Sequence, residues 1–276
     1  MSTITLANLR LNYRQVGHGP DVLLIHGWVS SLRMWADTQD RLAAAGYRAT
    51  ALDLPGFGAS DRPAFDWYSL DRYTQLLQAF VQRFNLQQPA VVGHSLGATL
   101  TLSLAATVPV RAVVACAPIV NGGLYGHRFL AATPTRRLVR RWQAHPLFGL
   151  LGEMSPVSMP GLARTDAQRR NQEDLGRTTY TAATGSLRTL IDLRLEERLR
   201  TIIAPTLILV GTRDLTVRPG QGRLAARLIP GARLVEWRGV GHGLLDDRPQ
   251  QFHALLLEHL SHTVPALSLN PASSNC

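Results

Sequence analysis

The sequence predicts one α/β domain in which helices flank a mostly parallel β-sheet. Short apolar runs alternate along most of the 276 residues with segments of helical periodicity. The runs are apolar at nearly every position, which is typical of parallel strands that are buried on both faces. Strands joined by single helices also favour right-handed crossovers within one sheet. A chain of this length can bury the core of one such domain and still carry an insertion.

The predicted elements begin with two antiparallel strands over residues 4–11 and 13–16, followed by a turn at Gly17-His18-Gly19-Pro20. Gly46 is the predicted C-terminal stop of the first helix. Strands are predicted over residues 22–26, 47–52, 90–93, 110–117, 206–210 and 232–237, and those at 22–26, 90–93 and 110–117 are expected to be buried. Helices are predicted over residues 32–45, 70–84, 99–106, 220–228 and 249–260.

The alternation stops between residues 121 and 200, where glycine, proline and arginine interrupt helical pieces and no strong strand signal occurs. We therefore predict a core made of residues 1–120 and 201–262, with residues 121–200 inserted on one face of the sheet as a helical cap. Residues 263–276 are polar, contain two prolines and are the predicted loose tail.

The net charge is +10, and every basic residue is arginine. The absence of lysine excludes catalysis by a Schiff-base lysine or a P-loop lysine. The arginines are scattered, and neither zinc-finger spacing nor an aromatic RNA-binding motif is present. We therefore expect no nucleic-acid partner.

The cysteines and the N-terminal residues indicate the cellular compartment in which the protein is expected. Cys116 lies in an apolar run and Cys276 at the terminus, so we expect no disulfide. The first residues lack the basic and apolar regions of a signal peptide. No apolar run approaches the ~18 residues of a membrane-spanning helix. The expectation is a reducing, cytoplasmic setting.

The stretch Gly93-His94-Ser95-Leu96-Gly97 joins a β-branched apolar run to a run rich in leucine and alanine. A strand, a sharp turn and a helix form the context in which a G-x-S-x-G motif exposes a serine hydroxyl. The flanking glycines are explained by the strained turn, where a Cβ would collide. The following helix N-terminus favours negative charge that develops at Ser95. Ser95 is the predicted nucleophile; the alternative is a chance pattern in a glycine-rich loop.

A serine hydroxyl is a weak nucleophile that needs a base, which an acid in turn orients. Asp214 follows the predicted strand 206–210 and is the candidate acid, with a helix N-cap as the alternative. His242 follows the strand that ends at Trp237 and is the candidate base, with a surface loop residue as the alternative. All three residues follow parallel strands, so we expect them at one edge of the sheet.

Attack on a carbonyl produces an oxyanion, which two N–H donors must stabilise. Leu96, directly after the serine, supplies one predicted backbone donor. Trp28, in the loop after the strand 22–26, supplies the other, and Gly27 lets the backbone approach the substrate. A core position of the Trp28 ring is compatible with this role, because only its backbone donates.

These motifs resemble those of the α/β-hydrolase superfamily, in which the order along the chain is also Ser, Asp, His. The resemblance spans about residues 21–260 and implies an eight-stranded, mostly parallel sheet under a helical cap. It is closest to serine esterases, carbon–carbon bond hydrolases and cofactor-free haloperoxidase-like members. Haloalkane dehalogenases and epoxide hydrolases are disfavoured, because they carry Asp where Ser95 stands. It also implies that the loop 53–60 is structural or lines the site. The motifs are His26-Gly27-Trp28, Asp53-Leu54-Pro55-Gly56-Phe57-Gly58-Ala59-Ser60, Gly93-His94-Ser95-Leu96-Gly97, Asp214 and Gly241-His242.

The predicted cap contains an arginine-rich helix in which Arg136 and Arg137 precede Arg140 and Arg141 by one turn. One interpretation is an access lid that attracts anionic acyl substrates and makes weak contact with an anionic membrane. We favour a solvated helix face over an apolar pocket. The residues expected to bind substrate are Tyr125, Trp142, Phe148 and Leu244.

The resulting hypothesis is a metal- and cofactor-independent serine hydrolase that cleaves an ester or a related acyl bond of a small molecule. Two alternatives use the same residues: a carbon–carbon bond hydrolase, and a ligand-binding or receptor protein without turnover. The sequence leaves both a monomer and a homodimer open.

Overall fold

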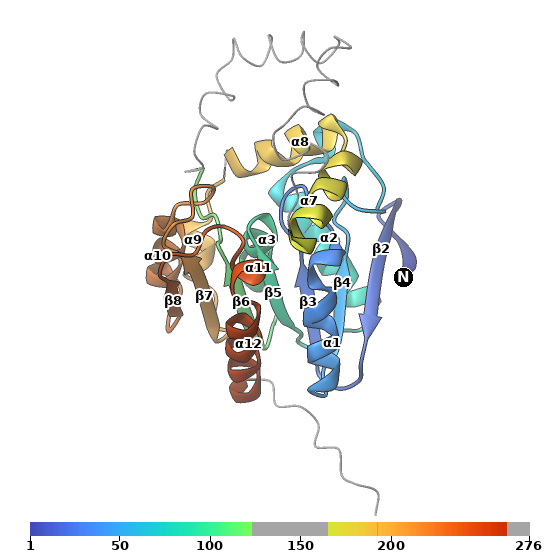
Figure 1. Cartoon of the computed structure of the whole chain (residues 1–276). Helices are drawn as coiled ribbons and strands as arrows, with labels where there is room; N and C mark the ends of the chain where they lie inside the picture. The colour runs from blue at the N-terminus through green and yellow to red at the C-terminus, as the bar shows by residue number, and fades with distance from the viewer. Residues whose placement is uncertain (123–164, 192, 264–276) are drawn as a thin grey trace, which may run out of the picture.

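The computed structural model of the chain describes residues 1–122, 165–191 and 193–263. Its strands are β1 (Ser2–Leu6), β2 (Leu9–Val16), β3 (Asp21–Ile25), β4 (Arg48–Leu52), β5 (Ala90–His94), β6 (Ala112–Cys116), β7 (Thr206–Gly211) and β8 (Arg233–Trp237). They form one eight-stranded sheet in the order β1-β2-β4-β3-β5-β6-β7-β8 (Figure 1). The pairings from β4 to β8 are parallel, whereas β1 with β2 and β2 with β4 are antiparallel. The predicted fold class and the implied strand number are confirmed.

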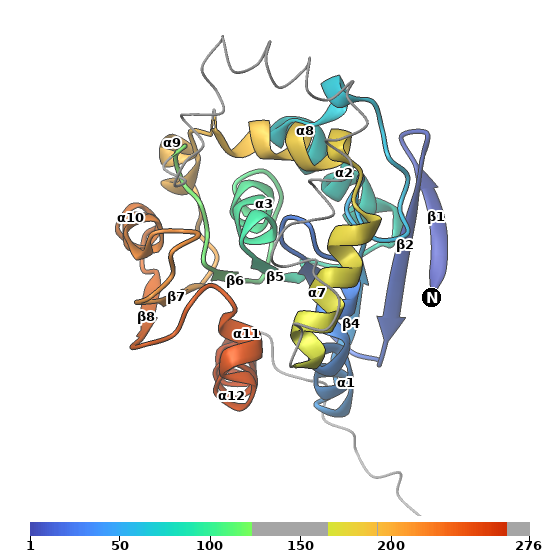
Figure 2. The same cartoon turned by 45° about the horizontal axis from the view of Figure 1, so that its top comes forward.

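Helices cover both faces of this sheet, as Figure 2 shows for α2, α3 and α10 on one face and α1 and α12 on the other. The described helices on the two faces and at the strand ends are η1 (Leu32–Trp35), α1 (Ala36–Ala44), η2 (Phe65–Trp67), α2 (Leu70–Arg83), α3 (Leu96–Ala105), α7 (Asp166–Arg177), α8 (Tyr180–Ile191), α9 (Glu196–Leu199), α10 (Pro219–Leu228), α11 (Leu244–Asp247) and α12 (Pro249–Thr263). The helices predicted over residues 32–45, 70–84, 99–106, 220–228 and 249–260 are present, η2 and α11 are additional short helices, and the predicted arginine-rich helix lies outside the described residues.

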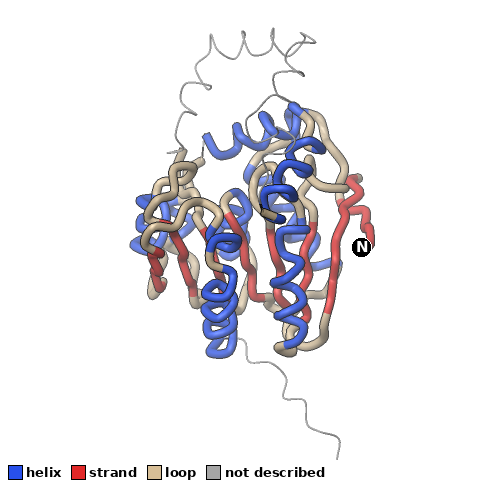
Figure 3. The backbone as a smooth tube through the Cα atoms, viewed as in Figure 1, coloured by secondary structure: helices blue, strands red, loops and turns tan. Residues whose placement is uncertain are grey.

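The core has two halves because successive residues of each buried strand point to opposite faces. Leu23 and Val91 belong to the cluster on the face of α2, α3 and α10. Leu24 and Val92, the next residue in each strand, belong to the cluster on the face of α1 and α12. This arrangement of helices on either side of the strands explains why the central strands are apolar throughout (Figure 3).

The N-terminal hairpin differs from its prediction. The turn lies at Ala7 and Asn8, and residues 9–16 form one strand. Both turn residues have positive φ, 47° and 61°, which is the backbone of a tight two-residue hairpin turn. Asn12 was expected between two strands but lies inside β2, where its buried amide Nδ2 donates to Asp53 Oδ2 at 2.8 Å. A tertiary contact, and not a turn, therefore accounts for this asparagine.

Two helices of the predicted insertion, α7 and α8, are called the insertion helices below. They follow β6 and precede β7 in the chain, and α8 crosses the upper end of the molecule in Figure 1. Thr165 caps α7 with a capping box that includes Gln168. At Gly185 of α8, an added Cβ would lie 2.4 Å from the ring of Tyr68, so this glycine permits close packing on the core. The division into core, cap and tail stays a prediction.

The length and composition of the helices determine whether one of them could cross a membrane. Over the described ranges, none of the helices combines the length and the apolar character that a bilayer crossing requires.

Candidate active site

Ser95 occupies a strained turn between β5 and α3. Its φ of 55° and ψ of −117° lie outside the regions that a side chain normally allows. Two backbone bonds hold the turn: the N–H of Ser95 donates to Cys116 O at 2.8 Å, and the N–H of Thr99 donates to Ser95 O at 3.0 Å. Such an outlier persists only where the surroundings enforce it. The backbone therefore presents this serine in the manner that a nucleophile requires.

The flanking glycines are needed because other backbone segments approach them closely. A Cβ at Gly97 would lie 2.1 Å from the carbonyl oxygen of Ile25, and one at Gly93 would lie 2.3 Å from that of Gly97. Both distances are far below a van der Waals contact, so neither position accommodates a side chain. The steric explanation that the sequence offered for this turn agrees with the structure.

Asp214 and His242 form a hydrogen-bonded pair. His242 Nδ1 lies 2.7 Å from Asp214 Oδ2, across 28 residues of sequence. The other carboxylate oxygen, Oδ1, accepts from the N–H groups of Thr216 and Val217, each at 2.8 Å. The Asp214 side chain is 1% exposed and that of His242 is 24% exposed. Asp214 thus caps a turn and holds the imidazole at the same time; the N-cap of the next helix, α10, is Arg218, so the helix N-cap alternative is not what the structure shows, and the catalytic role of Asp214 stays a prediction.

His94 connects this pair to the serine turn. It lies directly before Ser95, and its Nε2 lies 2.9 Å from the backbone oxygen of His242. The centroids of the two imidazole rings are 4.7 Å apart. Ser95, Asp214 and His242 follow β5, β7 and β8 respectively, and the contact of His94 shows that the first and last of these segments meet.

Burial fixes the charge of His94. Because desolvation disfavours the imidazolium, and His242 adds a further unfavourable interaction, the pKa of His94 falls to about 3. The ring is therefore neutral at pH 7. A carbonyl oxygen can only accept, so Nε2 carries the proton and donates it to His242 O.

The two residues predicted to supply the oxyanion-hole donors lie in segments that adjoin Ser95. Leu96 is the first residue of α3. The loop of Trp28 lies against the serine turn, since a Cβ at Gly27 would lie 3.4 Å from Ser95 Cβ and 3.1 Å from His94 Nδ1. The Trp28 ring is not part of the core: the residue is 40% exposed and its Nε1 donates to Ala183 O in α8 at 3.0 Å. The backbone role of Trp28 stays a prediction.

The loop 53–60 has a structural role, one of the two that the resemblance implied. Asp53 Oδ1 accepts from Leu32 N at 2.7 Å, and Oδ2 accepts from Asn12 Nδ2 and Ala59 N, each at 2.8 Å. The Ser60 hydroxyl donates to Asp53 O at 2.7 Å. With its side chain occupied in this way, Asp53 holds three segments together below the site.

Of the substrate-binding residues predicted from sequence, Leu244 alone lies among the described residues. Leu244 is fully buried in the core cluster on the face of α12, which does not support the prediction that it contacts substrate. The reason is local: α11 begins at this residue and turns it inward. Tyr125, Trp142, Phe148 and the arginines of the expected lid lie outside the described residues.

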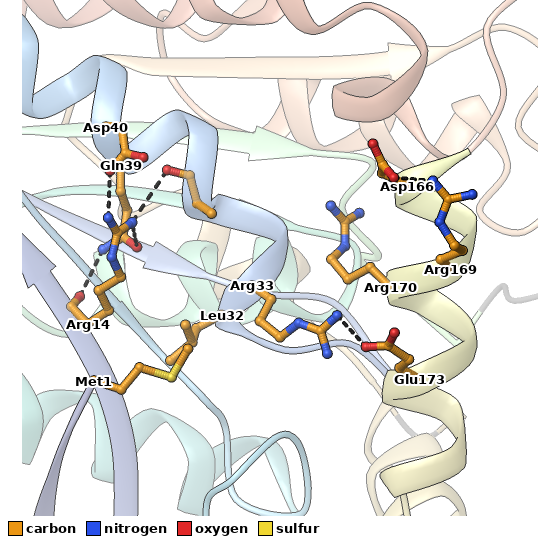
Figure 4. A pocket seen from close by; sticks show the side chains of 11 residues that line it. Met1, Arg14, Leu32, Arg33, Gln39, Asp40, Asp166, Arg169, Arg170 and Glu173 are labelled. Carbon is orange, nitrogen blue, oxygen red and sulfur yellow. Dashed lines mark hydrogen bonds and ion pairs between the residues drawn. The ribbon is translucent and has the colours of Figure 1, made fainter. Parts of the chain in front are cut away.

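A surface pocket of about 520 Å³ lies apart from these residues, between α7 and the segment of α1 and β2 (Figure 4). Its charged lining is paired: Arg14 with Asp40 and Arg33 with Glu173. Neither Ser95 nor His242 contributes to it. We therefore do not assign the chemistry to this pocket.

Sequence reasoning missed four side chains that act around the site: His94, the Trp28 indole, Arg170 and Asp174. His94 stood inside the serine motif, and its position there was the only available signal. The contacts of the other three depend on the packing of α7 and α8 against distant loops. Their partners lie 76 to 155 residues away in the sequence, beyond the reach of periodicity.

Comparison with known proteins gives the following similarities. Residues 22–255 match the alpha/beta hydrolase family. An uncharacterized protein of Mycobacterium tuberculosis is 27% identical over 279 residues, which is 95% of this chain and 81% of the relative. A 2-hydroxy-6-oxononadienedioate/2-hydroxy-6-oxononatrienedioate hydrolase of Pseudomonas putida is 26% identical over 92% of this chain and 93% of its own. A solved hydrolase structure from Pseudomonas aeruginosa matches with a TM-score of 0.79 and 25% identity, over 94% of this chain and 97% of that one.

Proposed function

The chain belongs to the alpha/beta hydrolase family, and on this premise we propose that it is a serine hydrolase that cleaves an ester or a related acyl bond. Ser95 is the nucleophile, His242 the general base and acid, and Asp214 the residue that orients the imidazole. The observation that carries the proposal is the 2.7 Å bond between His242 Nδ1 and Asp214 Oδ2, at the edge of the sheet where Ser95 stands in its strained turn.

The proposed reaction has two steps. Ser95 Oγ attacks the carbonyl carbon while His242 Nε2 takes the hydroxyl proton. The bond to the leaving oxygen then breaks, and His242 delivers that proton to it, leaving an ester between the acyl group and Ser95. Water attacks this ester, His242 takes a proton from the water, and the carboxylic acid leaves as Ser95 regains its hydrogen. Asp214 stabilises the imidazolium in both steps.

Each addition creates an oxyanion that needs preorganised donors. The N–H of Leu96, at the start of α3, and the N–H of Trp28 are the proposed pair. The helix N-terminus adds a favourable dipole at the same point. Loss of one such donor typically lowers the rate by about 10²–10³. These donors sit on the backbone, so side-chain replacement alone leaves them in place.

Carbon–carbon bond cleavage is the second candidate. The Pseudomonas putida relative is named as a hydrolase of 2-hydroxy-6-oxononadienedioate, and its similarity extends over 92% of this chain. The same serine, histidine and aspartate would serve on a β-diketone-like substrate. The two candidate reactions use the same nucleophile and differ in the bond that breaks. Activity measured on esters and on β-diketone-like compounds therefore distinguishes them.

The first test is covalent labelling. Purified protein is treated with a fluorophosphonate and examined by intact and peptide mass spectrometry. We expect one adduct on Ser95, none in Ser95→Ala, and normal labelling of Ser261→Ala, which removes an exposed serine of α12. A p-nitrophenyl ester and a β-diketone-like compound then distinguish ester from carbon–carbon cleavage. Folded protein without an adduct would contradict the proposal and favour a ligand-binding protein without turnover.

A further inference from the structure

Arg170 and Asp174 stand four residues apart in α7 and therefore lie on the same face of that helix. Arg170 forms an ion pair with Asp246 of α11: its Nη2 lies 3.1 Å from Oδ1 and 2.9 Å from Oδ2. The two side chains are 18% and 32% exposed, so the pair is largely shielded from solvent. Because α11 begins directly after His242 and Gly243, this contact fastens α7 to the segment of the candidate base.

Asp174, one turn further along α7, reaches the segment after β3. Its Oδ2 accepts a hydrogen bond from the Ser31 hydroxyl at 2.8 Å, and its Oδ1 lies 3.5 Å from Arg33 Nη1. The Asp174 side chain has no exposed surface. Ser31 also caps η1, three residues after the proposed donor Trp28. This contact fastens α7 to the segment that carries the proposed oxyanion hole.

Two more contacts join the same segment to the insertion helices. Arg33 Nη2 lies 2.7 Å from Glu173 Oε2, which Figure 4 shows as a link between η1 and α7. Trp28 Nε1 donates to Ala183 O of α8 at 3.0 Å. The segment after β3 is thus held at both ends, by α8 near its start and by α7 near its end.

We propose that α7 acts as a brace that holds the oxyanion-hole segment, residues 27–33, and the base segment, residues 242–247, in the relative positions that the reaction needs. Asp174 and Arg170 are its two positioning residues. The chemical roles of both segments rest on the function proposed above. That one helix holds both segments in place rests only on the contacts just described.

The burial of Asp174 supports this role over a simple contribution to stability. Burial raises the pKa of Asp174, although the Ser31 hydroxyl and Arg33 oppose the shift. A buried carboxylate costs free energy that an apolar side chain of similar size would not cost. Its directional bond to Ser31, however, fixes the loop in one position. Misplacement of a reacting group by ~1 Å can lower a rate by about 100-fold.

The test uses two variants of the full chain: Asp174→Ala, which cannot accept from the Ser31 hydroxyl, and Arg170→Gln. We expect each to lower the rate constant for inactivation by a small fluorophosphonate, and kcat for an activated acetate ester, by about 10-fold, with KM changed less than about twofold. The matched control is Arg169→Gln. Arg169 lies on the exposed part of α7 and pairs only with Asp166 of the same helix in the described contacts, so its loss should leave the rate unchanged.

A second readout does not require activity. Hydrogen exchange followed by mass spectrometry should show faster exchange at residues 27–33 in Asp174→Ala and at residues 242–247 in Arg170→Gln, with the rest of the sheet unchanged. A variant that merely destabilises the protein would raise exchange throughout. If either variant fails to fold, Ser31→Ala and Asp246→Ala remove the same bonds from the other side.

The outcomes are distinct. Slower inactivation together with local exchange supports the brace. Folded variants with wild-type inactivation and wild-type exchange overturn it. If Ser95 of the wild type does not react at all, the proposed function fails, and the exchange pattern alone decides whether α7 holds the two segments.

Discussion

His94 Nε2 donates a hydrogen bond of 2.9 Å to the backbone oxygen of His242, joining residues 148 positions apart. The residue that precedes the candidate nucleophile thereby holds the backbone of the candidate base. Both ends of this bond are fixed, one by the strained turn at Ser95 and the other by the bond from His242 to Asp214. We therefore infer that His94 is a positioning residue, which would act on the proposed reaction through His242.

Replacement of His94 should affect turnover more than binding. In His94→Ala the carbonyl of His242 loses its donor, and we expect kcat to fall about 10-fold with KM within about twofold. In His94→Gln the amide N–H can donate to the same oxygen, so part of the rate should return. Steady-state kinetics with an activated ester measures both effects. Equal kcat values in the wild type, the Ala variant and the Gln variant would show that the bond has no role in catalysis.

The neutral state of His94 predicts acid sensitivity. Its pKa is about 3 in the folded protein, against an ordinary value of 6.5. Between these values the unfolded chain binds the proton and the folded protein does not. The free energy of unfolding should therefore decrease as pH falls from 6.5 towards 3, with a contribution of about 1.4 kcal/mol per pH unit from this residue.

Urea unfolding at several pH values tests this dependence. His94→Gln cannot take up the proton and should show a shallower decrease than the wild type. Part of the decrease should remain, because burial also lowers the pKa of His26 and His253. If the free energy of unfolding falls as steeply with pH in His94→Gln as in the wild type, the pKa of His94 is not lowered in the folded protein, and other groups cause the acid sensitivity.

The charge of Asp214 should matter more than its shape. In Asp214→Asn the side chain can still accept from the N–H groups of Thr216 and Val217, so the turn should persist. The amide cannot stabilise an imidazolium, and we expect kcat to fall by about 10²–10⁴. Asp247→Asn is the matched control, since this carboxylate lies in α11 close to the same loop. A comparable loss in Asp247→Asn would indicate that Asp247 is the acid.

Buried strands were predicted well from sequence because their environment is uniform. Residues such as Val91 and Val92 face two different core clusters, so each position is apolar and the run is easily recognised. The N-terminal hairpin was predicted less well, since β1 lies at the edge of the sheet and three of its five residues are exposed. Its alternation is weak, and Asn12, which suggested a turn, is explained by a bond to Asp53 that only the fold creates.

Candidate site residues were predictable where they follow strands. Ser95 comes directly after β5, and Asp214 and His242 lie in the loops that follow β7 and β8; parallel strands bring these ends to one edge. Side chains from the insertion helices were not predictable in this way. Asp174 meets Ser31 across 143 residues, and no pattern in the sequence indicates which face of α7 packs on which loop. Positions of loops and inserted helices depend on tertiary contacts that periodicity does not encode.

The serine turn itself can be tested by steric means. In Gly97→Ala the new Cβ would lie 2.1 Å from the backbone oxygen of Ile25, and a shift of the β3 backbone to relieve this clash would cost free energy. We expect a loss of more than about 3 kcal/mol in the free energy of unfolding, or failure to fold. Gly220→Ala in α10 is the matched control. No heavy atom lies within 4 Å of the added Cβ there, and alanine favours the helix, so its stability should match or exceed that of the wild type. Chemical denaturation of both variants gives the comparison. A Gly97→Ala protein as stable as Gly220→Ala would mean that β3 and the N-terminus of α3 do not pack as closely as this turn requires.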